Sequence, residues 1–455
     1  MTPRPTDAPA DDYVATGDVA DSNDLSVPSD TVPPGKPPRP KLSPTERKAI
    51  FLLAPTVFID LLGFGIILPN LPQYIEQAVG HDHQHAAFIA GLLAASYSLT
   101  QFLCAPFWGS YSDRAGRRPV ILISLIGIGL AYILFGFSNG HLYMLFAARL
   151  LAGLLSSASI GVAFAYVADV TTPQNRATGM GILGACFGLG FAFGPVLGGV
   201  LGHINLSLPA FVAAGMALTN FAVSFFVLPE SLTAEKRAAL SGAVHEGYLT
   251  LMQRVLRDPA APIFLVTFIL TFGFTAIEQA FGFFLMARGI AQQGNQSLRQ
   301  AELLGTVGLV GIVLQGGLVG PLTRRFGEAF LIRTGLAILT CGYILLMIPR
   351  EWGPLVFVAT IFVGCGRSVI SPSAIALISR KTRVGQGLIQ SSSQGFDALA
   401  RTVGPLTAGT LFSAIGPLAP YVFSAFLTAL ALVVTFLLRD ALVLTPADRA
   451  HEAGR

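Results

Sequence analysis

A few charged side chains lie inside long apolar runs of a chain in which only 12% of the residues are charged. They include Asp60, Arg149, Glu278 and Arg367. A charge in an apolar segment is costly unless it faces a partner or a polar cavity. Desolvation favours the neutral form of a carboxylic acid, whereas a nearby arginine favours the carboxylate. An acid exposed to both influences is a candidate proton carrier.

Asp60 and Arg149 form the first candidate pair. Asp60 lies about 15 Å into the first apolar run, and Arg149 lies about 12 Å from the outer end of the fourth, at 1.5 Å per helical residue. In a hydrocarbon core of about 30 Å they reach each other if their helices adjoin. We expect protonation of Asp60 from outside to release Arg149, and substrate or the inward-facing state to restore the pair. The alternative is a static structural pair.

The other buried charges allow several roles. Asp397 and Arg401 are four residues apart and can neutralise each other on one helix face, which favours a structural role over proton coupling. Glu278 and Arg367 can pair, line a cavity or carry protons, and Glu278 can also lie at a wet outer end. We expect an amphiphilic substrate cavity. Its candidate lining residues are Phe64, Tyr97, Gln101, Gln279, Gln315, Arg367, Gln394 and Arg401, with Asn70, Phe274 and Phe281 as further candidates. The alternative for the aromatic residues is contact with lipid or neighbouring helices.

Long apolar runs must position these side chains. The chain of 455 residues is 53% hydrophobic with a mean hydropathy of +0.64, which indicates a lipid environment. Each run has the roughly 20 residues that a membrane-spanning helix needs. The sequence therefore predicts an all-α membrane protein with twelve transmembrane helices, near 48–72, 86–108, 119–138, 142–168, 178–202, 207–229, 261–287, 303–322, 329–348, 354–379, 385–413 and 417–438.

The longest polar break divides the spans into two sets of six. It predicts an N-terminal six-helix bundle at 43–229, a linker at 230–260 and a C-terminal six-helix bundle at 261–440. The segments 1–42 and 441–455 are predicted tails, the first of them disordered because it is polar and rich in proline.

Lys and Arg gather on one side of the predicted spans, and only Arg288, Arg299 and Arg350 lie on the other. The positive-inside rule then places both termini in the cytoplasm of a cell-membrane protein. The segment His81–His85 falls on the outer face, where a solvated polar loop is favoured over a metal site.

A charged segment at 109–118 connects the second and third spans: Gly109-Ser-Tyr-Ser-Asp113-Arg114-Ala-Gly116-Arg117-Arg118. Part of it recurs about 210 residues later as Gly320, Arg324, Arg325 and Gly327. Gly194-Pro195 likewise recurs as Gly404-Pro405 at nearly the same offset. Parallel six-helix repeats are a transporter architecture with a midplane substrate site between the halves.

These motifs resemble those of the major facilitator superfamily. The 109–118 segment is similar to its signature loop, Arg149-x-x-x-Gly153 to its fourth-helix motif, and the fifth-span motif to that of its proton-coupled exporters. That last motif comprises Gly190, Gly194, Pro195, Gly198 and Gly199. The segments around Asp60 and Asp169 look like the drug/proton antiporter branch, including tetracycline exporters. The resemblance covers residues 48–438.

The resemblance implies a conformational latch. Asp113 would face the N-terminus of the eleventh span, where exposed amides favour an anion, and Arg117 would pair with Asp169. Arg114 and Arg118, with Gly109 and Gly116, complete the latch motif. The alternative is that these charges only anchor a cytoplasmic turn. In the fifth span, physics alone indicates close helix packing and flexibility at Pro195.

Other functions lack the residues they need. We find no phosphate-binding Gly-x-x-x-x-Gly-Lys-Ser/Thr loop and no hydrolase motif, so we expect no enzyme activity and a proton gradient as the energy source, without a cofactor. The four cysteines form no pairwise motif, we expect no metal site, and the one-sided charge argues against nucleic acid.

The sequence therefore predicts a secondary transporter, a monomer, that exports lipophilic or amphiphilic drugs such as tetracycline-like compounds in exchange for protons. The alternatives are an importer or facilitator of a metabolite in the same fold, and a non-transporting membrane receptor or scaffold.

Overall fold

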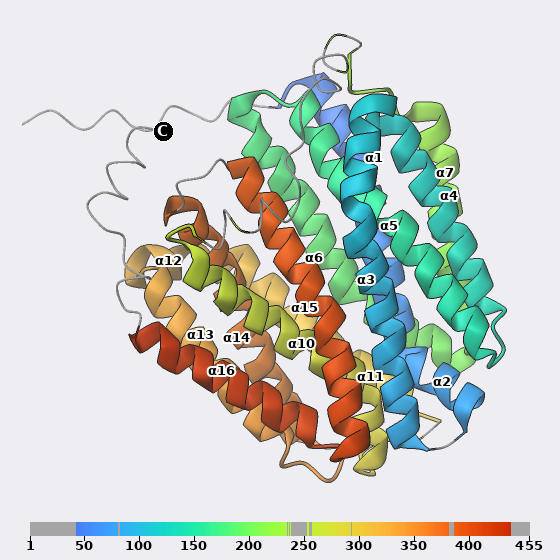
Figure 1. Ribbon diagram of the computed structural model, residues 1–455, viewed down its shortest axis with the longest axis vertical. Helices are drawn as coiled ribbons and strands as arrows, with labels where there is room; N and C mark the ends of the chain where they lie inside the picture. The colour runs from blue at the N-terminus through green and yellow to red at the C-terminus, as the bar shows by residue number, and fades with distance from the viewer. Residues whose placement is uncertain are drawn as a thin grey trace, which may run out of the picture. The chain divides into compact units, whose positions relative to one another are not determined.

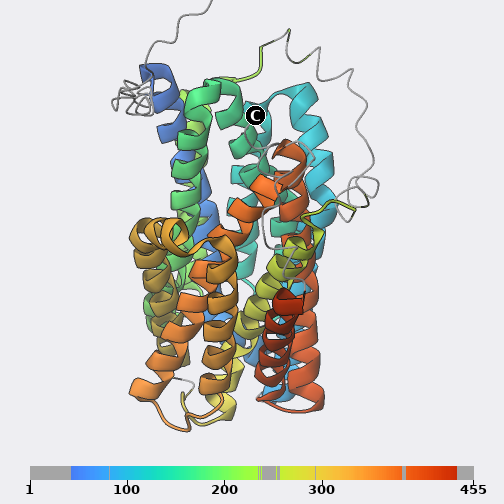
Figure 2. The same cartoon turned by 90° about the vertical axis from the view of Figure 1, so that its left-hand side faces the viewer.

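The computed structural model describes residues 42–80, 82–233, 235, 237, 253, 257–292, 294–381 and 386–437. The predicted tails at 1–42, except for residue 42, and at 441–455 and most of the predicted linker therefore lie outside the described residues. The described part is helical, and its long helices look close to parallel in Figure 2, whereas Figure 1 shows α10 (Ala261–Ala287) and α16 (Ala419–Leu437) tilted relative to α1 (Pro44–Ile67).

The first group of helices comprises α1 (Pro44–Ile67), the short turn Leu68–Asn70, α2 (Leu71–Val79), α3 (His83–Ala115), α4 (Arg117–Gly136), α5 (Leu142–Val170), α6 (Pro173–Ile204) and α7 (Leu208–Val227). We call it the N-terminal bundle. Within it α1 packs on α6, α4 lies against α5 and α7, and α3 lies against α5 (Figure 1).

The second group, the C-terminal bundle, begins with α10 (Ala261–Ala287) and α11 (Gln296–Val313). It continues through the π-helical turn Leu314–Leu318, α12 (Val319–Phe326), α13 (Glu328–Leu346), α14 (Pro354–Lys381), α15 (Gln386–Ala414) and α16 (Ala419–Leu437). Here α13 packs on α14 and α16, and α10 packs on α15.

The twelve predicted spans agree with this architecture. Eleven stretches of the described residues are long and apolar enough to cross a membrane, and they join α1 with α2 and α11 with α12 into single spans. The twelfth span is α15, which is less apolar because it carries Gln386, Gln390, Ser391, Asp397 and Arg401, among other polar residues.

The charged segment at 109–118 differs from the predicted turn. Residues 109–115 form the last turns of α3, and α4 begins at Arg117. Only Gly116 leaves the helical conformation, with φ of 107°. Gly327 ends α12 in the same way with φ of 80°. Glycine adopts this region at little steric cost, so the sequence repeat is also a repeat of backbone geometry.

The polar segment at 81–85 also differs from the predicted solvated loop. Asp82 caps α3, because its carboxylate accepts hydrogen bonds from the backbone amides of Gln84 and His85. His83 lies inside α3, and its Nδ1 is 2.6 Å from Oε1 of the buried Glu76. His81 lies outside the described residues. Among the described residues no group of three or more His, Cys, Asp or Glu side chains could hold a metal ion.

The two bundles touch mainly along two helix pairs, α3 with α15 and α6 with α11, and α3 also contacts α10. A Cβ atom on Gly91 would overlap the Pro405 carbonyl, and one on Gly308 would lie 2.6 Å from the Cα and Cβ atoms of Ala192. These glycines permit a backbone approach that a side chain would prevent.

The contacts cluster toward the end of the bundles that carries the α2–α3 and α10–α11 connections. There Gly199 faces Ala301, and the Gln296 side chain donates to the Pro69 carbonyl at 3.2 Å. Toward the other end, a Cβ atom on Gly109, Gly184 or Gly188 would meet no described atom within 4 Å. The structure therefore shows the bundles closed at the first end, which we call the closed end.

Candidate functional site

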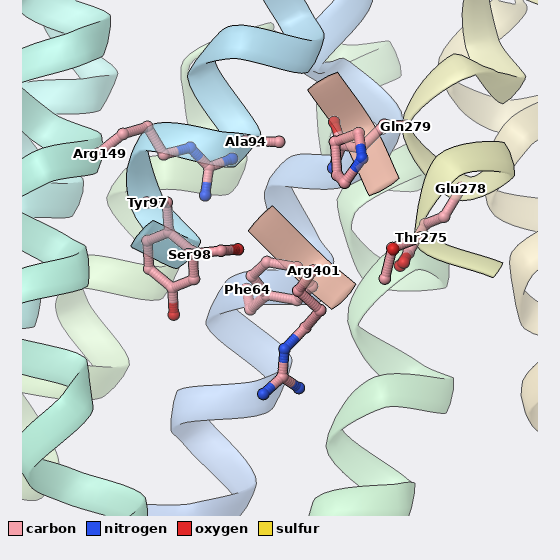
Figure 3. A pocket seen from close by; sticks show the side chains of 10 residues that line it. Phe64, Ala94, Tyr97, Ser98, Arg149, Thr275, Glu278, Gln279 and Arg401 are labelled. Atoms are coloured by element: carbon pink, nitrogen blue, oxygen red, sulfur yellow. The ribbon is translucent and has the colours of Figure 1, made fainter. Parts of the chain in front are cut away.

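A pocket lies between the two bundles. The N-terminal bundle contributes Phe64 from α1, Ala94, Tyr97 and Ser98 from α3, and Arg149 from α5; the C-terminal bundle contributes Thr275, Glu278 and Gln279 from α10, and Arg401 and Pro405 from α15 (Figure 3). The pocket is thus an interface site, and any movement between the bundles changes its shape.

Arg149 enters the pocket from the N-terminal bundle. Only 4% of its surface is exposed, and its guanidinium lies 5.8 Å from the ring centre of Tyr97 and 5.3 Å from that of Phe135. Cations interact favourably with aromatic faces at these distances. Its Nε atom has no hydrogen-bond partner among the described residues.

Asp60 is buried beside this pocket and contacts a serine. The Ser159 hydroxyl donates a hydrogen bond to Oδ2 of Asp60 at 2.8 Å. No ion pair joins Asp60 to Arg149 within the described residues, so the pair that the sequence predicts is not formed in this conformation. The prediction that the two alternate between paired and separate states stays a prediction.

A polar track in α5 connects Asp60 with the pocket. Ser159 lies one turn from Ser156, whose hydroxyl is 3.0 Å from the Tyr97 hydroxyl. The predicted cavity residue Gln101 donates to the same serine at 3.3 Å and therefore stands behind Tyr97. The serines of α5 were missed at the sequence level, although their recurrence at 156, 157 and 159 in an apolar span was a signal.

Glu278 is buried at the pocket, and Arg367 is partly buried between aromatic rings of the two bundles. Glu278 is 4% exposed, so it does not lie at a wet end, and its Oε1 has no hydrogen-bond partner among the described residues. The Arg367 guanidinium lies 3.6 Å from the ring centre of Phe274 and 5.4 Å from that of Phe191. It stands behind the pocket wall, and it forms no ion pair with Glu278 within the described residues.

The predicted pairing of Asp397 with Arg401 is not seen. Oδ1 of Asp397 accepts a hydrogen bond from the Thr271 hydroxyl of α10 at 2.8 Å. Arg401 turns into the pocket instead, and its Nε atom has no partner among the described residues (Figure 3). A spacing of four residues allows Asp397 and Arg401 to pair, but Thr271 of the neighbouring helix α10 donates a hydrogen bond to Asp397 instead.

The remaining cavity candidates differ in where they lie. Phe64, Tyr97 and Gln279 line the pocket as expected. Gln315 is exposed in the π-helical turn and does not line it, and Asn70 is fully buried, donating to the carbonyls of Ile66 and Gly198. Phe274 and Phe281 are buried but are not among the pocket-lining residues. The side chain of Gln394 lies outside the described residues.

The predicted contact between Arg117 and Asp169 is present. Nε of Arg117 lies 3.2 Å from Oδ2 of Asp169, and its Nη1 lies 2.7 Å from Oδ1 of Asp113. The partly buried guanidinium therefore ties the end of α3 to the end of α5. The predicted contact of Asp113 with the start of α15 involves side chains outside the described residues.

Glu230 also contacts Arg117. The sequence did not distinguish this residue from the other charged residues of the linker. Its carboxylate accepts hydrogen bonds from the backbone amides of Arg117 at 2.9 Å and Arg118 at 3.2 Å. It therefore caps the start of α4, where amides lack helical partners and favour an anion. Of the remaining latch residues, Arg118 donates to the Phe225 carbonyl and Arg114 is exposed.

The fifth-span glycines pack as closely as the sequence predicts. Cβ atoms on Gly190 and Gly194 would lie within 3 Å of backbone carbonyls of α1, and one on Gly198 would overlap the carbonyl of Ile66. Pro195 of α6 packs beside Gly65 of α1. Gly199 faces α11 of the other bundle. One stretch of α6 therefore contacts both bundles.

The chain forms two helical bundles from apolar helices of membrane-spanning length, its sequence repeats between the bundles, and a pocket lies at their interface. These features together are typical of a membrane transporter. The sequence profile of the Major Facilitator Superfamily matches residues 53–383 and 279–454. The chain belongs to this superfamily.

Similar proteins agree with this membership. The chain is 33% identical to the class C tetracycline resistance protein of Escherichia coli over 80% of this chain and 90% of that protein. It is 28% identical to multidrug resistance protein 2 of Bacillus subtilis over 88% and 98% of the two chains. The crystal structure of the human organic anion transporter MFSD10 superposes with a TM-score of 0.65 at 27% identity, covering 86% of this chain and 99% of that one.

Proposed function

We propose that the protein exports lipophilic or amphiphilic compounds, tetracycline-like drugs among them, in exchange for protons by alternating access. The observation that carries the proposal is the position of two buried carboxylates, Asp60 and Glu278, in different bundles around one pocket, neither in an ion pair within the described residues. Buried acids of this kind in membrane proteins mark proton and substrate pathways. The similarity to tetracycline and multidrug resistance proteins supports the same function.

Asp60 and the α5 serines give a route for the proton. Asp60 holds a proton when desolvated and releases it when Arg149 or water stabilises the carboxylate. The serine and tyrosine hydroxyls between Asp60 and the pocket allow the charge on Asp60 to depend on what occupies the pocket. Substrate and proton would thereby exclude each other, which is what antiport requires. Asp397, hydrogen-bonded to Thr271, remains a second acid of the C-terminal bundle available for proton coupling.

The orientation in the membrane follows from the basic residues. We call Asp113, Arg117, Asp169 and Glu230 the latch cluster. The positive-inside rule assigns this cluster and both termini to the cytoplasm. The closed end is then the outer end, and this conformation is inward-facing. We propose that it is the state that takes up substrate from the cytoplasm of a monomeric cell-membrane transporter. A predominantly lipid-facing surface is compatible with the exposed apolar residues on the helices.

The latch cluster would regulate exchange between the two states. Arg117 holds Asp113 and Asp169 together at the end of the N-terminal bundle. A shift from 1:99 to 99:1 between two states needs about 5.5 kcal/mol. A few charge contacts made in only one state are sufficient to supply a large part of it.

Everted membrane vesicles provide the test. An antiporter accumulates tetracycline or a lipophilic dye when the lumen is acidic, and Asp60→Asn removes this accumulation at equal protein level. Asp82→Asn is the matched control, because Asp82 is exposed and asparagine also caps helices well. Accumulation that is insensitive to the pH gradient indicates a facilitator, and loss of luminal substrate on acidification indicates a symporter. A receptor or scaffold predicts no accumulation at all.

A further inference from the structure

Two arginines line the pocket from opposite bundles. Arg149 of α5 is buried and Arg401 of α15 is partly buried, and Figure 3 shows Arg149 beside Tyr97 and Arg401 beside Phe64. Each has an Nε atom without a hydrogen-bond partner among the described residues. Burying a guanidinium donor without a partner is unfavourable, so these groups indicate a ligand that supplies acceptors.

The balance of charge in the pocket is positive. Glu278 is the one acid among the pocket-lining residues, against two arginines. Asp60 accepts a hydrogen bond from Ser159, and Asp397 accepts one from Thr271, so neither carboxylate is directed to the pocket arginines as an ion-pair partner. Within the described residues no ion pair joins Glu278 to Arg149 or Arg401. Protonation of Glu278 would leave two cations and no anion.

We propose that the pocket binds the anionic group of an amphiphilic substrate, such as a carboxylate on an aromatic ring system, between Arg149 and Arg401. A guanidinium binds a planar carboxylate through two parallel hydrogen bonds, which an ammonium group cannot match. The ring system lies against Phe64 and Tyr97, and the polar side chains of Ser98, Thr275 and Gln279 meet its other polar atoms.

An anion in this position also has a mechanical effect. Without it, the like charges of Arg149 and Arg401 oppose approach of the two bundles around the pocket. With it, each bundle contributes one donor to the same ligand, so binding stabilises conformations in which the two helices are close. This inference rests on the proposed function for the direction of transport, but binding of the anion does not depend on that direction.

Two dyes that share one ring system distinguish charge from hydrophobicity. Fluorescein carries a carboxylate, and rhodamine 6G is a cation built on the same xanthene rings. We expect saturable binding of fluorescein to the purified full-length protein in detergent, measured by fluorescence anisotropy. Arg401→Gln and Arg149→Gln should each raise its Kd about tenfold to hundredfold, because a charge-assisted hydrogen bond is lost.

Control variants separate this effect from misfolding. Arg350→Gln removes an exposed arginine outside the pocket and should leave the Kd unchanged. Arg401→Lys keeps the charge and should retain part of the affinity, while all variants keep the elution volume of the wild type. The absence of saturable fluorescein binding, or a Kd that neither glutamine variant changes, would overturn the proposal.

Transport in proteoliposomes separates the two proposals. If both dyes fail to move in response to a pH gradient while fluorescein still binds through the arginines, proton-coupled export is wrong and the anion site stands. If rhodamine 6G moves and fluorescein neither binds nor moves, export stands and the anion site is wrong.

Discussion

Closure of the closed end depends on backbone contact between α6 and α11, and a single methyl group should disturb it. In Gly308→Ala the new Cβ atom would lie 2.6 Å from the Cα and Cβ atoms of Ala192. Neither a backbone atom nor a short side chain can move aside, so the helices must separate. Overpacking of this kind costs about 1–3 kcal/mol. That free energy shifts the equilibrium between closed and open forms of this end by about 5- to 150-fold.

A cysteine in the same interface reports the opening. Ser297 is buried at the closed end, where its carbonyl faces Gly199. With the four native cysteines replaced by alanine, Ser297→Cys should react slowly with a membrane-impermeant maleimide, and Gly308→Ala should increase the rate. The matched control is Gly215→Ala on α7, where a Cβ atom would meet no described atom within 4 Å.

The control shares the general gain in helix propensity that alanine brings over glycine. The difference between the two variants therefore isolates the interface contact. Equal labelling rates in Gly308→Ala and Gly215→Ala would refute the reasoning that this contact keeps the closed end closed.

Three further predictions concern side chains that join helices. Arg117→Gln should lower the stability in detergent by about 3–5 kcal/mol, because Asp113 and Asp169 lose their shared cation in a partly buried site; a thermal midpoint equal to that of the wild type would contradict this. Glu230→Gln should lower the thermal midpoint by less than Arg117→Gln does, since an amide oxygen still accepts hydrogen bonds at the start of α4 but brings no charge to the helix dipole. Asn70→Ala should cost about 1–3 kcal/mol, because its two bonds to backbone carbonyls connect α1 with α6, and Asn70→Gln is the polar control.

The sequence carried much information about the fold because lipid constrains it strongly. Backbone groups in the hydrocarbon region must be satisfied within helices, so apolar runs predict spans directly. The boundary errors arose where polar residues continue a helix beyond the apolar part. Residues 109–115 extend α3, and Asp82 starts the same helix earlier than hydropathy indicates.

The sequence predicted which charged residues are buried at the site better than it predicted which residues they contact. Burial of Asp60, Arg149 and Glu278 followed from their position in apolar runs, and the Arg117 contact with Asp169 followed from a recognised motif. The partners of Asp397 and Arg401 depended on α10 and on the pocket, because spacing along one helix contains no information about the neighbouring helix.

Proton flux linked to substrate movement tests the central claim most directly. Proteoliposomes are loaded with tetracycline and a luminal pH dye, diluted into tetracycline-free buffer at equal pH, and compared with protein-free liposomes. Proton-coupled antiport predicts that tetracycline efflux through the protein acidifies the lumen and that Asp60→Asn abolishes the acidification. Protein-dependent efflux with no change in luminal pH, or with a rise, would contradict the account.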